Sequence, residues 1–547
     1  MVLHAHLPYV KHPEHEFFIE ENWFFEAITE TYIPLLDVFD RLFSDGIASP
    51  VTFSLSPPLI EMMNDNLLQS RYVRYLEQRI ELARSEVKRT RSNAEFHDTA
   101  LMYLDRFLKI KHLYENRYAG DLVGAFADLQ NQGRIEIITT AATHGFLPHL
   151  SEHENSVQAQ LAIAAEHYLQ TFGRPPSGLW LPECGYYTGL DHLVRKAGFD
   201  YFFLDAHGVI FGKPTPHCGH YNAITTHAGT AAFGRDPFSA NQVWSSHNGY
   251  PGDFDYRDFH RDIGFELPLE TVRSYIHPDG IRTQTGLKYY RITEDSGKGI
   301  KKPYQRITAV SKAKLHAEHF VNHVLKDRCV LSCSSNTAPP VITSAYDAEL
   351  FGHWWFEGPQ WLEFVYRKLA SDSGNLRPVT AGAYLQQYGD NLLKLLPAPS
   401  SWGEGGYGAM WLDHSNHWIH PLLQDAAVRM TELANKHPNA TGKVRNILNQ
   451  AARELLLAQS SDWPFLIRQN TAAAYSKRRI LEHIKRFNRL LSALKSGRKP
   501  ALKPSNAYER AGSGQTSKKS NNNWNDIFKQ MDLFRFFLTA GHQKDTG

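Results

Sequence analysis

The chain has 547 residues, of which 42% are hydrophobic, with 59 basic and 57 acidic side chains. This length exceeds one ordinary domain but suits a barrel enzyme with additional units, so we expect two or three structural units. The near balance of charge argues against nucleic acid or an acidic membrane as a partner and favours a neutral ligand.

The first residues, MVLHAHLPYV, predict a strand that ends in histidine and proline and leads into an aromatic-rich helix. Further short apolar stretches between helix-like segments are typical of buried parallel strands. They are VTFSL (51–55), IEIITT (135–140), SGLWLPE (177–183), YFFLDAHG (201–208) and VITSAYDAEL (341–350). This alternation predicts an α/β fold.

Polar side chains gather where these strands end. They are His4 and His6, His144, Glu183, Asp205 with His207, and Asp347. In barrels of parallel strands the active site lies at the C-terminal edge and takes residues from several strands. Buried core polar groups would explain one or two of these residues, so we expect the set to converge on one site.

The remaining organisation follows from composition and periodicity. The charged stretch at about 66–130 predicts a helical insertion into a barrel unit spanning 1–400, and apolar residues at helical spacing predict a helical unit over 401–496. Residues 497–522 have the composition of a flexible linker. The apolar part of the segment 523–547 is expected to dock back onto the protein.

The four cysteines form no convincing disulfide framework, and the chain contains no export signal or apolar run of 18 residues. We therefore expect a cytoplasmic protein. Cys329 and Cys333, in CVLSC, are interpreted as buried strand residues rather than metal ligands.

Glu183, in WLPECGYYTG, follows an apolar strand and is surrounded by aromatic residues, which favours a desolvated carboxyl group. The alternative is a capping or salt-bridged glutamate. Asp347 ends another strand and is followed by His353 and Trp354, a combination that fits a saccharide site. Two such carboxyls indicate glycosidic chemistry, and a retaining mechanism would place them about 5–5.5 Å apart.

A metal site is the main chemical alternative. The motif HAH at the start and HSNHWIH at 414–420 contain candidate ligands, but no HExxH motif is present. We therefore expect no metal.

The motifs HAHLPYV, ATHGFLP, WLPECGY, YDAELFGHWWFEGP and SSWGEGGY, in this order, resemble the sequence regions of glycoside hydrolase family 57, most closely its 1,4-α-glucan branching enzymes. The resemblance covers nearly the whole chain except the linker. It implies a distorted (β/α)7 barrel with a helical insertion and an all-α C-terminal domain, acting without a cofactor by a retaining mechanism.

The resemblance also implies residue roles. Glu183 corresponds to the nucleophile and Asp347 to the general acid/base. Trp244, Trp402 and Trp411 correspond to an aromatic wall. The residues expected to line the glucan site are His4, His6, His144, His207, Arg235, Trp244, Gly252, Trp402, Trp411 and Asp462, to which the strand-end reasoning adds His353 and Trp354. The implied donor and acceptor are α-1,4-glucans, and we expect a monomer with no nucleic-acid or membrane partner.

Three features depart from the family pattern. The chain begins inside the first expected strand, the stretch 209–233 is short and offers only Tyr221 as a loop tyrosine, and Thr471 replaces a usual glutamine. The alternatives left open are a family 57 α-amylase or 4-α-glucanotransferase, a metal-dependent carbohydrate esterase, and a non-catalytic glucan-binding protein.

Overall fold

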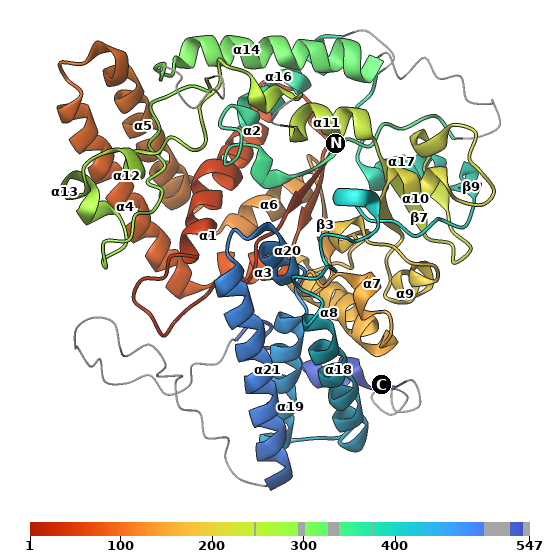
Figure 1. Ribbon diagram of the computed structural model, residues 1–547. Coiled ribbons are helices and arrows are strands. Elements are labelled where there is room, and N and C mark those ends of the chain that lie inside the picture. Colours follow the sequence, from red (N-terminus) through yellow and green to blue (C-terminus); the bar gives the residue numbers. More distant parts are fainter. Residues whose placement is uncertain (246–247, 294–300, 327–337, 373–375, 497–525, 540–547) are drawn as a thin grey trace.

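The computed structural model describes residues 1–245, 248–293, 301–326, 338–372, 376–496 and 526–539 (Figure 1). Within these residues one sheet has the strand order β8-β1-β2-β3-β4-β5-β7-β6-β9. The strands are β1 Val2–Ala5, β2 Thr52–Leu55, β3 Glu136–Thr140, β4 Gly178–Trp180, β5 Tyr201–Asp205, β6 Ile224–Thr225, β7 Ala231–Arg235, β8 Ala345–Asp347 and β9 Leu393–Lys394.

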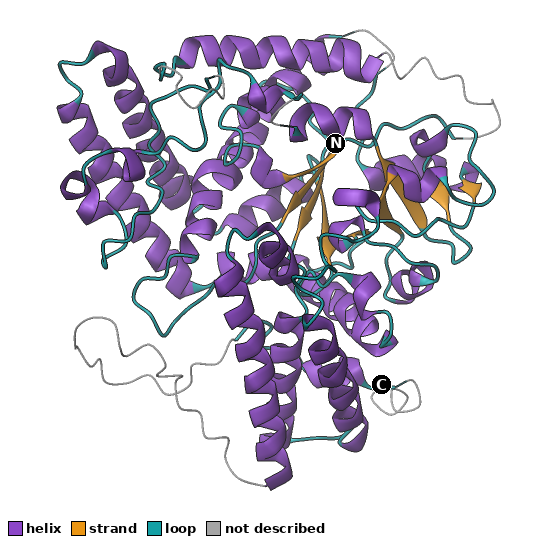
Figure 2. Cartoon of the chain, viewed as in Figure 1, coloured by secondary structure: helices purple, strands orange, loops and turns teal. Residues whose placement is uncertain are grey.

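The strands form one curled, mostly parallel sheet, which helices surround (Figure 2). β1 lies between β8 and β2, so that His4 is in register with Asp347 on one side and with Ser54 on the other. At the opposite edge, Arg235 of β7 forms a parallel bridge with Thr343, just before β8. Because a short bridge closes the curled sheet, the fold is the distorted (β/α)7 barrel that the sequence resemblance implied.

The seventh barrel strand, β7, was missed by the strand reasoning. Its sequence, AAFGR, contains two alanines and a glycine, which are poor strand formers, so no apolar run marks it. The strand forms because it pairs with β5: Ala231–Arg235 aligns along its whole length with Tyr201–Asp205. Together with the six strands named from the sequence, β7 makes up the seven strands of the barrel that the resemblance implied.

Helices cover the barrel and extend from it (Figure 1). Those close to the barrel are α1 Glu21–Ala27, α2 Ile33–Ser44, α3 Pro57–Met63, α6 Leu122–Asn131, α7 Leu147–Leu150, α8 Glu154–Phe172, α9 Leu190–Lys196, α10 Ala206–Ile210, α11 Pro237–Trp244, α14 Arg306–His319, α16 Gly358–Ser371 and α17 Ala381–Tyr388. On one side stand α4 Asn66–Arg89, α5 Ala94–His112, α12 Ile263–Glu266 and α13 Leu269–Val272. The C-terminal helices are α18 Ile419–Lys436, α19 Gly442–Ala458, α20 Asp462–Gln469 and α21 Ala473–Ser496.

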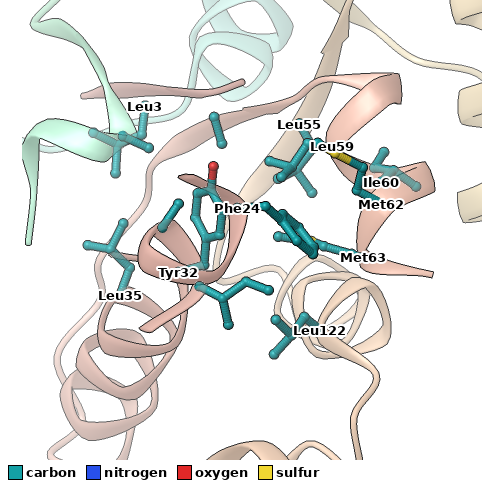
Figure 3. Close-up of a cluster of buried hydrophobic side chains, with 14 of the residues drawn as sticks. Leu3, Phe24, Tyr32, Leu35, Leu55, Leu59, Ile60, Met62, Met63 and Leu122 are labelled. Atoms are coloured by element: carbon teal, nitrogen blue, oxygen red, sulfur yellow. The ribbon is translucent and has the colours of Figure 1, made fainter. Parts of the chain in front are cut away.

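The largest hydrophobic core joins the first strands to the helices that follow them (Figure 3). Leu3 of β1, Leu55 of β2, Phe24 of α1 and Tyr32 are at most 1% exposed. Burying side chains of this size stabilises a fold by about 1.5–3 kcal/mol each. The core thereby fixes β1, and with it the histidines at the end of that strand.

The C-terminal helices form a bundle below the barrel, while α20 lies against the barrel face (Figure 1). Residues 526–539 pack against this bundle and α8, with Phe534 and Phe537 fully buried. The expected linker at 497–522 lies outside the described residues. The domain boundaries drawn from sequence remain predictions.

One cysteine expectation is corrected. Cys184 is free and buried, but Cys218 is disulfide-bonded. Sequence spacing did not indicate this bond, because pairing depends on which segments the fold brings together. Cys329 and Cys333 lie outside the described residues. Among the helices that are described, none is both long and apolar enough to cross a membrane.

Candidate active site

Two strand ends at the barrel's C-terminal edge have left-handed backbone conformations. Glu183, in the turn Pro182–Cys184 after β4, has φ 60° and ψ 23°, and His144 after β3 has φ 55°. Outside glycine this conformation is uncommon and costs about 1–3 kcal/mol. Segments distant in sequence hold both residues there: Trp402 N–H donates to the Glu183 carbonyl oxygen (2.9 Å), and Ser461 N–H donates to that of His144 (3.0 Å).

The Glu183 carboxylate is held by two uncharged donors. Trp402 Nε1–H donates to Oε2 at 2.7 Å, and the Ser461 hydroxyl donates to Oε1 at 2.8 Å. Burial raises the pKa of Glu183 to about 7; these two hydrogen bonds oppose the rise, and the charges of Asp347 and Asp462 add to it. The Glu183 carboxyl is thus desolvated, but the two hydrogen bonds stabilise its ionised form.

Asp347 ends β8, beside His4 of β1. Burial raises its pKa to about 7, the charge of Glu349 adds to the rise, and Arg235 and His6 oppose it. Among the described residues no hydrogen bond contributes to this shift. The charge of Asp347 contributes to the raised pKa of Glu183, so the two carboxyls lie within electrostatic reach of each other.

Three histidine rings stack on one another beside Glu183. The rings of His6 and His144 are 3.9 Å apart, and His4 lies 5.0 Å from His144 and 4.8 Å from Trp180. Burial keeps the pKa of His4 and His144 well below the usual range. Burial also lowers the pKa of His6, but the charge of Asp462 and its 3.0 Å hydrogen bond, with help from other carboxylates, outweigh burial and raise it.

Polar side chains at the ends of β5 and β7 also contact one another. His207 lies 2.8 Å from the carbonyl oxygen of Gly406 through Nε2 and 3.5 Å from Asp205 through Nδ1. Arg235 Nη1 is 3.6 Å from Asp205, and its guanidinium lies over the Trp402 ring at 5.3 Å. The two expected site residues His207 and Arg235 are thus joined through Asp205, and Arg235 also contacts the Trp402 ring.

The expected tryptophan wall is only partly assembled. Trp402 and Trp411 share one apolar cluster with Phe146 and Met410, and Trp411 is 1% exposed and stacked on Phe146. Trp244, at the end of α11, is 56% exposed and belongs to none of the described clusters. Trp411 therefore supports the wall from behind, while Trp244 stands apart from the other two.

His353 and Trp354 contact Glu30 and Phe259, and no described contact joins them to Glu183 or Asp347. The turn before them needs glycine, since Gly352 has φ 115° and a β carbon there would lie 1.8 Å from the Glu30 carbonyl oxygen. His353 Nδ1 bonds to Glu30 Oε2 at 2.6 Å, and Trp354 stacks on Phe259 at 4.6 Å. Half-buried Gly252 ends the turn Tyr250–Gly252 and has no described contact with Glu183 or Asp347.

The histidines of HAH are already bonded to protein groups. His4 contacts Ser54 and His144, and His6 contacts Asp462. Within the part of the chain that the structure describes, no group of three or more His, Cys, Asp or Glu side chains could hold a metal ion.

Two site residues escaped the sequence reasoning. Ser461 precedes Asp462 and reaches Glu183, and Glu349 accepts hydrogen bonds from the Tyr32 hydroxyl and from His6 N–H (3.2 Å). The signals were present but weak: a hydroxyl beside an expected site residue, and a second carboxyl two positions after the strand end.

The departures from the family pattern also have locations. The Tyr221 hydroxyl donates to Asp236 Oδ1 at 3.2 Å, and Thr471 is exposed just after α20. Within the described residues no contact joins Tyr221 to Glu183 or Asp347. Tyr221 therefore stays only a candidate for the loop tyrosine.

Comparisons with known proteins identify the family and the fold. The family model "Glycosyl hydrolase family 57" matches residues 1–266, and "1,4-alpha-glucan branching enzyme, C-terminal" matches 422–534. The 1,4-alpha-glucan branching enzyme TK1436 of Thermococcus kodakarensis is 32% identical over 90% of this chain and 73% of its own length. Crystal structures of similar fold include the alpha-amylase AmyC of Thermotoga maritima (TM-score 0.83, 41% identity, 91% and 93% coverage) and the branching enzyme of Pyrococcus horikoshii (0.80, 33%, 90% and 90%).

Proposed function

The chain belongs to glycosyl hydrolase family 57, and we infer that it is a 1,4-α-glucan branching enzyme, which cleaves an α-1,4 bond and transfers the released chain to a 6-hydroxyl. The observation that carries the chemistry is the pair of buried carboxyls, Glu183 and Asp347, on two strand ends with contrasting surroundings. The similarity to branching enzymes extends through the C-terminal helices, which supply Ser461 to this pair.

The different surroundings of Glu183 and Asp347 support one carboxyl as the nucleophile and the other as the general acid/base. Two interacting carboxyls with pKa values of about 7 share one proton near neutral pH. Trp402 and Ser461 stabilise negative charge on Glu183, so the proton resides on Asp347. Glu183 then attacks the anomeric carbon while Asp347 protonates the leaving oxygen, and Asp347 next accepts the proton of the incoming 6-hydroxyl.

The donor and acceptor in this proposal are α-1,4-glucans. Transfer requires the glycosyl-enzyme to last until a second glucan arrives, so the cleft must bind the acceptor and limit access by water. Trp402 offers an aromatic face beside Glu183, and Arg235 and His207 offer polar groups on the same wall. Trp411 backs this wall, and His6 and Asp462 border the carboxyl pair from the other side.

Starch hydrolysis by the same carboxyls is the second candidate. It is favoured by the 41% identity to the AmyC α-amylase structure and by the short stretch 209–233. An amylase would perform the same first step, with water in place of the 6-hydroxyl in the second. The two functions therefore differ in the acceptor.

The deciding experiment incubates the purified chain with amylose and follows α-1,6 anomeric signals by proton NMR alongside new reducing ends. A branching enzyme yields α-1,6 signal with few reducing ends, whereas reducing ends without α-1,6 signal identify an amylase. Glu183→Gln is the control, because it keeps the shape of the side chain but removes the nucleophile. Full turnover by this variant would contradict both functions as assigned to this site.

A further inference from the structure

We propose that Ser461 is a positioning residue for the nucleophile Glu183, and that His144 and His4 set the direction in which its hydroxyl proton points. This rests on the proposed role of Glu183. One continuous hydrogen-bonded path carries the inference: Ser54 Oγ to His4 Nδ1 (3.0 Å), His4 Nε2 to His144 Nε2 (3.0 Å), His144 Nδ1 to Ser461 Oγ (2.8 Å), and Ser461 Oγ to Glu183 Oε1 (2.8 Å).

The two histidines on this path must be opposite tautomers. Both rings are 2% exposed, and burial, reinforced by the nearby His6, depresses the pKa of each, so both are neutral at physiological pH. A neutral imidazole has one N–H and one acceptor nitrogen. The contact between the two Nε2 atoms needs one of each, so one ring carries its proton on Nε2 and the other on Nδ1.

The charge on Glu183 determines the direction in which the hydrogen bonds along this path donate. An ionised carboxylate only accepts, so the Ser461 hydroxyl donates to it and accepts from His144 Nδ1–H. His144 Nε2 then accepts from His4 Nε2–H, and His4 Nδ1 accepts from the Ser54 hydroxyl. Each polar atom along the path has a partner in this arrangement.

Protonation of Glu183 on Oε1 would disrupt this hydrogen-bond arrangement, because the protonated oxygen would donate where it now accepts. The new O–H would then face the Ser461 hydroxyl proton, unless that proton turned away and lost its acceptor, or both histidines exchanged their protonated nitrogens and reversed the path. Oε2 is already bonded to Trp402 Nε1–H. The path thus favours the ionised nucleophile and counters the burial that raises its pKa.

Other titratable groups also lie near Glu183. They are Asp347 from β8, Asp462 from α20, His6 from β1 and His144 from the loop after β3, with the buried Cys184 thiol beside it. Replacing Ser461 by alanine leaves all of these groups in place. A change in the pH profile of that variant would therefore report on the hydroxyl.

The first test measures total α-1,4 cleavage of amylose, as the sum of α-1,6 linkages and reducing ends, against pH in the full chain. Losing one hydrogen bond to a charged group should raise the pKa of Glu183, so the acidic limb of kcat/KM should move to higher pH by about one unit in Ser461→Ala. Ser461→Thr, which keeps a hydroxyl, should leave the acidic limb at its wild-type pH.

The matched control is Ser460→Ala, which removes a hydroxyl bonded to Asp462 rather than to Glu183 and should leave the acidic limb in place. An unmoved limb in Ser461→Ala overturns the proposal. So does an equal movement in both alanine variants, because the effect would then not belong to the Glu183 hydrogen bond.

The second test needs no activity and so separates this proposal from the branching assignment. Two-bond proton–nitrogen NMR of the full chain labelled with ¹⁵N-histidine would identify each tautomer, with signals assigned from His4→Asn and His144→Asn. We expect the proton on Nε2 of His4 and on Nδ1 of His144 at neutral pH. Identical tautomers, or an imidazolium at either position, would refute the path even in an active enzyme.

Discussion

Asp347 and Glu349 place two carboxyls close together in one buried space. Burial raises the pKa of both to about 7; for Glu349 the hydrogen bond from Tyr32 opposes that rise. The charge of Glu349 further raises the pKa of Asp347. Glu349 therefore helps Asp347 to keep the proton that a general acid needs at neutral pH.

Glu349→Gln should shift the basic limb of the kcat/KM profile to lower pH. The neutral amide removes a like charge, so the pKa of Asp347 falls and the acid form is lost earlier as pH rises. Initial rates on amylose across the pH range would measure the shift, with Glu16→Gln, an exposed carboxylate, as control. A basic limb that stays in place would show that Glu349 does not act on Asp347.

Among the elements, the C-terminal segment is secured by both apolar and polar contacts. Its turn Leu533–Phe537 packs against α8, α18 and α19, and Phe534 is fully buried. Asn449 of α19 accepts a hydrogen bond from Phe534 N–H at 3.1 Å, and Arg445 pairs with Asp532 at 3.0 Å. The segment thus completes the packing of the C-terminal bundle.

Phe534→Ala should lower the free energy of unfolding by about 3–5 kcal/mol, because it removes a buried ring and leaves a cavity between the segment and α19. Urea unfolding followed by circular dichroism would measure the loss. Lys529→Ala, at an exposed position of the same segment, should have little effect. Equal stability of the two variants would mean that the segment is not part of the cooperative fold.

At the scale of the whole molecule, the proposed active site lies where the C-terminal helices meet the barrel. Gln160 of α8 donates to Gln459 at 3.0 Å, and His6 of β1 pairs with Asp462 of α20 at 3.0 Å. The same contact region brings Ser461 to Glu183. Docking of the C-terminal helices onto the barrel is therefore required for the hydrogen bond between Ser461 and the proposed nucleophile Glu183.

The His6 and Asp462 pair should make this docking depend on pH. The pKa of His6 is raised in the folded state, so the pair stabilises the protein fully below the unfolded value of about 6.5 and loses this effect as pH rises through the folded pKa. Asp462→Asn should thus lower the melting temperature more at pH 6 than at pH 8.5. A loss that is equal at both pH values would contradict a charged His6.

Much of this molecule was predictable from local sequence. Six barrel strands appear as short apolar runs, and the C-terminal helices as stripes such as Ile447, Leu448, Ala451 and Leu455, all buried. The motifs around Glu183 and Asp347 indicated the two carboxyls that the barrel brings to one edge. These features depend on periodicity and on neighbouring residues, which the linear sequence contains directly.

The rest required the tertiary structure. Strand β7 and the closing bridge from Arg235 to Thr343 depend on pairing partners rather than on propensity. The donors that support Glu183 come from Trp402 and Ser461, more than 200 residues further along the chain. Sequence alone determined which residues could carry the chemistry, whereas packing between distant segments decided which of them meet, because burial, hydrogen-bond partners and pKa are properties of the assembled surroundings.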